Sequence, residues 1–264
     1  MKNFIIIGAI SMALFSCSQP EPQTEAATGQ DFIGSIIQND STSVSFNVHW
    51  EENTLTFYNG VQESFEVTLS GEDTLRGTFP VFASDLWLVP TEDGFKGEYY
   101  RTDANNYHLP LELKPGTIKY EKISSNFSSQ YAITRYIGDE EKPALLQLDT
   151  KDGVLVGTIA TSTGDSRFMT GYEVEGGFEL MGFDGRFIYK VSAAVSDRTI
   201  EGHVWAGMTG YYTFSGIADD NATLENQRKC QGCVKIIPTL SGTCRVLMAI
   251  PFTLIAAPSL SLPS

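Results

Sequence analysis

Cys230 and Cys233 are the residues whose spacing most directly suggests chemistry. A Cys-x-x-Cys pair that opens a helix can have a lowered thiol pKa and exchange disulfides. Lys235 and Pro238 follow the pair, but a polar run at 226–229 precedes it, where a buried strand would be expected. Only 31 residues follow Cys233, too few for a separate redox domain. Two interpretations stay open: a thiol–disulfide exchange site, or an accidental pair, which we favour.

Cys17 points to lipidation. Lys2 precedes an apolar stretch at 4–15, which has the length of a secretory signal core and is too short to cross a bilayer. The stretch ends in Leu-Phe-Ser-Cys, which resembles a bacterial lipobox, where the Cys thiol is acylated and the chain is cut before it. We therefore expect a lipoprotein signal peptide at 1–16 and a lipid on Cys17. The alternative is an ordinary cleaved signal peptide.

The other chemistry-bearing residues form no recognisable catalytic or metal site. His49, His108 and His203 are scattered and lack the spacing of metal ligands. A zinc site built on Cys244 and the Cys-x-x-Cys pair has no obvious fourth ligand. No Gly-x-Ser-x-Gly nucleophile elbow occurs, and the acidic run at 139–141 is typical of a solvated turn. We expect no metal and no cofactor.

Two turn segments carry charged residues. In 163–168, Asp165 and Arg167 are either a charged pair at a barrel mouth or parts of a tight hairpin. We favour the hairpin, with Asp165 capping backbone amides and Arg167 covering a neighbouring strand. The dipeptide Asp184-Gly185 lies between two apolar runs and predicts a β-hairpin.

These residues must be positioned by strands, because the sequence from 32 to 217 has the pattern of a β protein. Short runs rich in Val, Ile, Phe, Tyr and Thr alternate with polar residues and end at Gly, Asp or Asn, as in 43–48, 64–69 and 186–191. We find no long amphipathic helix in this span. With no Cys in the span, stability must come from burial, and we expect its aromatic residues, Trp50, Trp87 and Trp205 among them, to form the core.

An apolar-x-Gly-x-apolar pattern recurs four times and indicates how the strands curve. Its glycines are Gly77, Gly97, Gly157 and Gly202. Each glycine shares a sheet face with its apolar neighbours, and glycine within a strand marks a bend or a close approach of another backbone. Two copies precede Pro115 and two follow Phe127. The fold class we predict is all-β: an antiparallel meander forming a bent barrel or sandwich in two related halves.

The predicted organisation has five parts. They are the signal peptide at 1–16, a flexible tether at 17–30, the first β half at 31–115, the second β half at 127–226, and an atypical tail at 227–264. The tail is apolar and interrupted by proline, and it has almost none of the acidic residues that precede it. We expect it to be irregular. It is a C-terminal strand with a hydrophobic tail, a truncated remnant, or the product of a frameshift, which we favour.

Several short motifs, in order, resemble the β-rich N-terminal region of TlpA-like lipoproteins of the Gram-negative envelope. The motifs lie at 80–82, 107–111, 143–144, 163–171, 178–180, 183–185 and 219–224. The resemblance covers about 46–224. It implies a thioredoxin-like domain after the β region, bearing Trp-Cys-x-x-Cys and acting as a thiol–disulfide oxidoreductase. That motif is absent, and Cys230 and Cys233 come too soon for the linker that the family has.

Charge and the resemblance together define the expected function. A net charge of −14 without a basic cluster excludes nucleic acid as a partner. We expect a lipoprotein held in the outer membrane by its N-terminal lipid, facing the periplasm, with an accessory or binding β domain and no activity of its own. Its partner would be a periplasmic protein or a small apolar ligand. The alternatives are a thiol–disulfide oxidoreductase using Cys230 and Cys233, and a lipocalin-like carrier of an apolar ligand.

Overall fold

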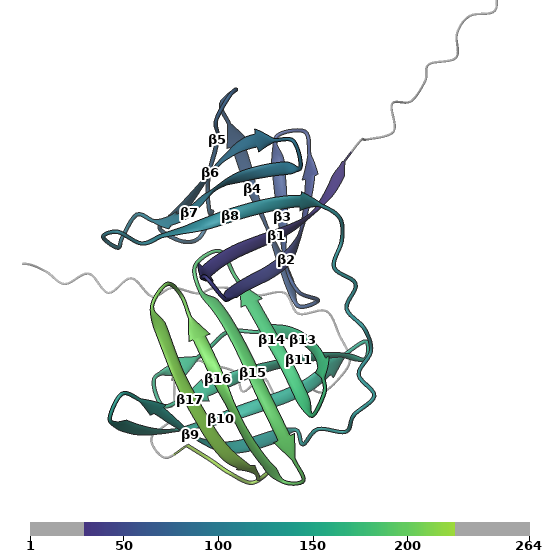
Figure 1. The fold of residues 1–264 in the computed structure, drawn as a ribbon, viewed down its shortest axis with the longest axis vertical. Coiled ribbons are helices and arrows are strands. Elements are labelled where there is room, and N and C mark those ends of the chain that lie inside the picture. Colours follow the sequence, from purple (N-terminus) through teal and green to yellow (C-terminus); the bar gives the residue numbers. More distant parts are fainter. Residues whose placement is uncertain (1–28, 225–264) are drawn as a thin grey trace, which may run out of the picture. The chain divides into compact units, whose positions relative to one another are not determined.

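Two closed antiparallel sheets make up residues 29–224, the part of the chain that the computed structural model describes (Figure 1). The predicted all-β fold in two antiparallel halves is confirmed. No helix in this part has the length and apolarity needed to cross a membrane. Cys17, Cys230 and Cys233 lie outside the described residues, as do the predicted signal peptide, most of the tether and the predicted tail from residue 227.

The first sheet is an eight-stranded barrel in which every strand pairs with the next and the last returns to the first. Its strands are β1 (Gln30–Asn39), β2 (Thr42–Glu51), β3 (Thr54–Asn59), β4 (Glu63–Ser70), β5 (Leu75–Thr78), β6 (Ser84–Thr91), β7 (Gly94–Arg101) and β8 (His108–Pro115).

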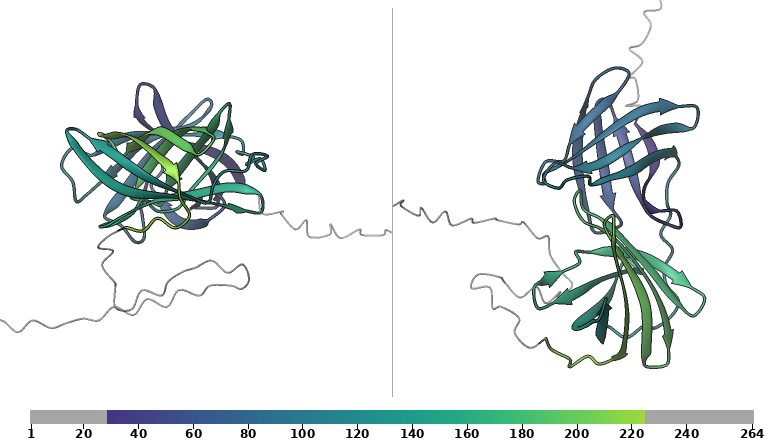
Figure 2. Two further views of the ribbon diagram at one scale, coloured as in Figure 1. Left: turned by 90° about the horizontal axis from the view of Figure 1, so that it is seen from below. Right: turned by 60° about the vertical axis from the view of Figure 1, so that its left-hand side comes forward.

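The second sheet closes in the same up-and-down order, with one short extra strand. Its strands are β9 (Gln130–Ile137), β10 (Glu140–Lys151), β11 (Val154–Thr161), β12 (Gly164–Asp165), β13 (Met169–Val174), β14 (Gly177–Phe183), β15 (Ile188–Ser196), β16 (Thr199–Ala206) and β17 (Gly210–Ala218). Pairing runs from β9 through β10 and β11 to β13 and on to β17, which pairs with β9. Figure 2 shows both closed sheets from two further directions.

Alternation along the strands explains why the sheets close around apolar interiors. In β1 and β2, buried and less buried residues alternate along almost the whole strand. At two of the four repeated glycines, a carbonyl of the adjacent strand approaches closely. A Cβ at Gly97 would lie 1.8 Å from the carbonyl oxygen of Trp87, and one at Gly202 would lie 2.4 Å from that of Ser192. Any larger residue at these two positions would push neighbouring strands apart.

Each barrel has its own apolar core. Phe46, Phe57 and Tyr99 are fully or almost fully buried in the first, and Tyr131 and Phe178 are in the second. The expectation that the three tryptophans form the core is wrong for two of them. Trp50 packs against the first core, but Trp87 alternates with the buried Leu86 and Leu88, so it faces outward. Trp205 likewise alternates with buried Val204 on the outer wall of β16.

The turn between β14 and β15 belongs to the core of the first barrel. The Phe183 ring lies 5.0 Å from Phe46 and 5.3 Å from Tyr99, measured between ring centroids. The Tyr99 hydroxyl donates to the Arg186 carbonyl at 3.1 Å, and the Ser84 hydroxyl donates to the Gly185 carbonyl at 2.6 Å. Antiparallel pairing of β14 with β15 up to Phe183↔Ile188 confirms the hairpin predicted at Asp184-Gly185. It also fills space inside a barrel to which its own strands do not belong.

The connector between the barrels, residues 116–129, is anchored at both ends. Asn47 in the first barrel accepts from the Ile118 amide at 2.7 Å and donates to its carbonyl at 3.0 Å. Glu173 in the second accepts from the amides of Ser124 at 2.6 Å and Ser125 at 2.5 Å. Hydrogen bonds from Ser125 and then Ser124 lower the pKa of Glu173 to about 2.

Candidate functional site

The wall of the first barrel is incomplete between β4 and β5. Only two residue pairs join these strands, Leu69↔Gly77 and Ser70↔Arg76. By contrast, six pairs join β3 to β4 and eight join β6 to β7. The seam is short because β5 has four residues, half the length of β4.

Pro80 limits how far the pairing between β4 and β5 could continue. Continuing the register of the two pairs places Thr78 opposite Thr68 and Pro80 opposite Glu66. Proline has no main-chain N–H, so it cannot donate to a neighbouring strand. A ladder between β4 and β5 therefore ends before it reaches Glu66.

The main chain of Glu66 faces this gap. The Leu69 amide donates to the Asn53 carbonyl at 2.7 Å, on the β3 side of β4. N–H and C=O groups alternate sides along a strand, so those of Leu69 and Val67 face β3 and those of Glu66 face β5. Among the described residues, neither the β4–β5 ladder nor a side chain supplies a partner for the Glu66 main chain.

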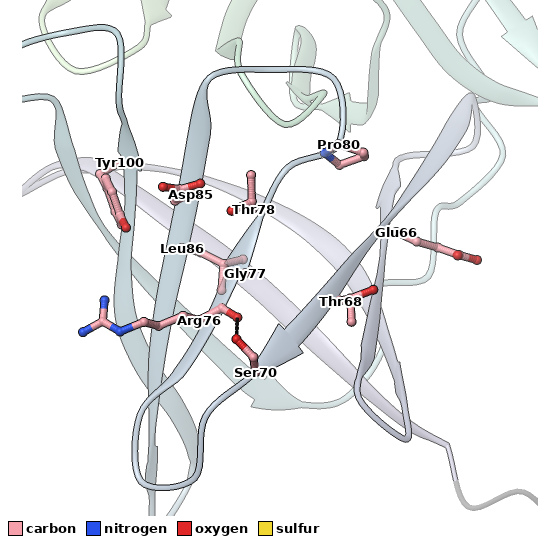
Figure 3. A pocket seen from close by; sticks show the side chains of 10 residues that line it. All are labelled: Glu66, Thr68, Ser70, Arg76, Gly77, Thr78, Pro80, Asp85, Leu86 and Tyr100. Atoms are coloured by element: carbon pink, nitrogen blue, oxygen red, sulfur yellow. Dashed lines mark hydrogen bonds between the residues drawn. The ribbon is translucent and has the colours of Figure 1, made fainter.

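A polar pocket of about 480 Å³ lies over the open seam (Figure 3). It is lined by Glu66, Thr68, Ser70, Arg76, Gly77, Thr78, Pro80, Asp85, Leu86 and Tyr100. Figure 3 shows the strands close together where the Ser70 hydroxyl donates to the Arg76 carbonyl at 3.5 Å, and further apart toward Glu66 and Pro80. The pocket is therefore a wedge, which we call the β4–β5 wedge, with free main-chain groups along one side.

The wedge is suited to hydrogen bonding. Its charged side chains are the carboxylates of Glu66 and Asp85 and the guanidinium of Arg76, and Thr68 and Thr78 add hydroxyl groups. Burial, followed by the neighbouring Asp85 carboxylate, raises the pKa of Tyr100, so this phenol keeps its proton at neutral pH. None of the lining residues is a Cys or a His. The lining thus offers several hydrogen-bond donors and acceptors.

The second barrel has a comparable seam, but the chain fills it. The ladder between β11 and β13 has three pairs and ends at Gly157↔Met169. Beyond it, β12 pairs with the end of β11 through Ala160↔Asp165 and Thr161↔Gly164. Both main-chain groups of Ile159 are paired with Ser166, whose amide donates at 3.0 Å and whose hydroxyl accepts at 2.9 Å.

A second outward-facing surface lies on the second barrel. The rings of His203, Trp205 and Tyr211 lie 5.8–6.0 Å apart between centroids, and the Tyr211 side chain is exposed. The His203 Nδ1 and the Tyr211 hydroxyl are hydrogen-bonded at 2.8 Å. A groove of about 500 Å³ runs beside them, with Glu175 and Glu201 in its lining. Exposed aromatic rings beside a groove are typical of binding surfaces.

The interiors are filled by side chains. Phe183 fills one part of the first barrel. A second aromatic group fills another part: the ring centroids of Trp50 and Phe95 lie 4.6 Å apart, and Phe32 packs beside both rings. The second core is filled by residues such as Phe178 and Leu180, both fully buried. The pockets described above lie on outer walls.

The favoured interpretation of 163–168 is confirmed. The Asp165 carboxylate accepts from the Arg167 amide at 3.0 Å. Arg167 pairs with Asp184 at 3.3 Å instead of with Asp165, and its guanidinium lies 5.7 Å from the Phe187 ring centroid. These residues therefore hold the β14–β15 turn in place. Within residues 29–224, no group of three or more His, Cys, Asp or Glu side chains is arranged to hold a metal ion.

The wedge was not predicted from the sequence. The available signal was Pro80, which follows a short run in the glycine pattern and removes a donor where a strand would continue. No protein-family model matches the chain, and comparison with curated proteins gives no match.

Proposed function

We propose that this chain is a lipid-anchored envelope protein, facing the periplasm, whose two barrels form a binding module without catalytic activity. The observation that carries the binding role is the β4–β5 wedge, where a polar pocket on the outer wall meets the main chain of Glu66, which has no partner within residues 29–224. Unpaired main-chain groups at a strand edge favour association with another chain. The exposed aromatic rings of the second barrel support the same role.

The packed interiors weigh against the alternative of a lipocalin-like carrier. A carrier barrel needs an interior wider than its own side chains. Here aromatic side chains occupy the inside of the first barrel, and one of them, Phe183, comes from the second. Native mass spectrometry of the purified chain tests this point, and we expect the mass of the protein without a retained ligand. A stoichiometric apolar ligand would favour the carrier.

An insulin-reduction assay separates the binding module from the thiol–disulfide oxidoreductase. The comparison is between the chain and the double variant Cys230→Ser/Cys233→Ser. Both positions lie outside the described residues, so circular dichroism of the two proteins is compared alongside the assay. We expect the two proteins to reduce insulin equally slowly. Activity that is lost in the double variant would overturn the non-catalytic role.

Fractionation of cells tests the anchor. With Cys17→Ser, we expect the protein to leave the membrane fraction, because no acyl chain can be attached without the thiol. The wild-type chain should stay with the membrane and enter the detergent phase of a detergent partition. Equal membrane retention of the two would contradict the lipid anchor and leave the binding role to be judged by the other assays.

A further inference from the structure

The β4–β5 wedge has the features of a site for strand addition. We propose that it binds an extended, net-basic segment of a partner protein, which pairs with β4 at Glu66 as an added strand. The inference deepens the proposed binding role and rests on it. It specifies both the mode of binding, through the main chain, and the chemical class of the partner.

The first argument is the direction of the free main-chain groups. Both groups of Glu66 face the wedge, the β4–β5 pairs end at Leu69↔Gly77, and Pro80, opposite Glu66 in the continued register, has no N–H to donate to the Glu66 carbonyl. An extended peptide that lies beside a free edge gains main-chain hydrogen bonds from alternate residues. The pocket volume of about 480 Å³ falls within the usual range for binding pockets.

The second argument is that the same chain fills its other seam in this way. In the second barrel, β12 adds to the edge of β11 where the ladder with β13 ends. Ser166 then satisfies the amide and the carbonyl of Ile159. The hairpin of β11 and β13 thus pairs its edge again beyond the break, in a register shifted by one residue, whereas among the described residues no segment pairs with β4 beyond Leu69↔Gly77 on the β5 side.

The third argument is charge. Two carboxylates, Glu66 and Asp85, line the wedge against one guanidinium, Arg76, and the whole chain carries a net charge of −14. A carboxylate at a strand edge repels an acidic strand and attracts a basic one. It also disfavours a second copy of this chain, since pairing of two β4 edges would bring two Glu66 side chains together.

Three capped hexapeptides test the proposal by calorimetry at about 0.15 M salt, where long-range attraction is screened. The first alternates threonine and lysine. The second has the same side chains but carries an N-methyl group on every residue, so neither of its edges can donate to a strand ladder. The third alternates threonine and glutamate. We expect binding of the first peptide and at least about tenfold weaker binding of the second, since the lost main-chain bonds supply the affinity.

The charge of the partner is decided by the third peptide, which we expect to bind more weakly than the lysine peptide. Equal binding of the N-methylated and unmethylated peptides would overturn strand addition. Equal binding of the acidic and basic peptides would overturn the basic partner. Absence of binding by all three would overturn this inference but would leave the outcome of the insulin assay, and hence the non-catalytic role, unchanged.

Variants of Glu66 locate the binding to the wedge. Glu66→Pro removes the N–H that faces the pocket, and we expect it to weaken lysine-peptide binding at least about tenfold. Glu66→Gln keeps the N–H and removes only the charge, so we expect a loss of a few-fold. Unchanged binding by the proline variant, with its circular dichroism preserved, would contradict the proposal.

A second variant covers the case in which Glu66→Pro does not fold. Thr78 is exposed and points outward at the wedge, so Thr78→Trp fills the pocket without touching the main chain of β4. We expect this variant to lose lysine-peptide binding while keeping the thermal stability of the wild type. Binding as tight as that of the wild type would place the peptide elsewhere and overturn the proposal.

Discussion

The two barrels have the same strand order, but they differ in whether the main chain beside a short strand ladder is paired. In the second barrel, β12 and Ser166 complete the edge of β11, and the main chain of Ile159 is paired. In the first barrel, pairing ends at Leu69↔Gly77, and the main chain of Glu66 is left facing a polar pocket. Closure of a barrel therefore does not by itself remove every free strand edge. In the first barrel, a four-residue strand that is followed two residues later by a proline leaves one open.

The largest expected effect concerns the dependence of the first barrel on the second. Phe183→Ala should destabilise the protein by about 3–5 kcal/mol, because it removes a ring that packs against Phe46, Phe79 and Tyr99. The measurement is urea unfolding combined with hydrogen exchange. Although residue 183 belongs to β14, exchange should become faster in the first barrel, in β2 and β7, which carry Phe46 and Tyr99.

Phe178→Ala is the matched control for this comparison. Phe178 is also a fully buried ring of β14, but it packs in the second core. A similar loss of stability should therefore appear as faster exchange in the second barrel. If both variants loosen only the second barrel, the β14–β15 turn does not belong to the core of the first.

A smaller loss of stability is expected when the hydrogen bond between Ser166 and Ile159 in the second barrel is removed. Ser166→Ala removes the hydroxyl that accepts from the Ile159 amide, and both groups are buried. Leaving that donor without a partner should cost about 1–3 kcal/mol, measured by urea unfolding. Ser70→Ala is a suitable control, since its hydroxyl is exposed and makes only a bond of 3.5 Å, and it should change stability little. Equal effects of the two would contradict the role of Ser166.

The smallest effect is a response of the connector to acid. The pKa of Glu173 is lowered to about 2 in the folded protein, so the stabilisation by its carboxylate is fully present above its ordinary pKa of about 4.5. That stabilisation is lost as the pH falls toward 2. We expect the amide signals of Ser124 and Ser125 to titrate with a midpoint near 2 in NMR spectra.

The hydrogen bonds between Asn47 and Ile118, which anchor the other end of the connector, should not respond to acid. Asn47 holds Ile118 through a neutral amide, which does not titrate. Glu173→Gln should also abolish the acid response at Ser124. A shift of the Ile118 amide with the same midpoint would show that acid unfolds the whole molecule instead of releasing one anchor.

Local patterns in the sequence were sufficient to predict the fold class and several turns. Alternation predicted the strands, the glycine pattern predicted the close approaches at Gly97 and Gly202, and Asp184-Gly185 predicted a hairpin. These features depend on neighbours in the chain or in the adjacent strand, so their signals lie within a few residues.

The candidate site could not be predicted in this way. The wedge requires the register between β4 and β5, which decides that Pro80 lies opposite Glu66. The position of Phe183 inside the first barrel depends on contacts with residues more than 80 positions away. The prediction that Trp87 and Trp205 belong to the core is wrong for a related reason. Composition does not say which face of a strand points inward.

Native-state hydrogen exchange of single amides tests the central claim, that β4 has a free main-chain edge, most directly. We expect the Glu66 amide of the unliganded protein to exchange rapidly, while its neighbours Phe65 and Val67, which face β3, are protected. The Ile159 amide, whose seam is filled, should be protected as well. Slow exchange at Glu66, equal to that at Val67 and Ile159, would contradict the account.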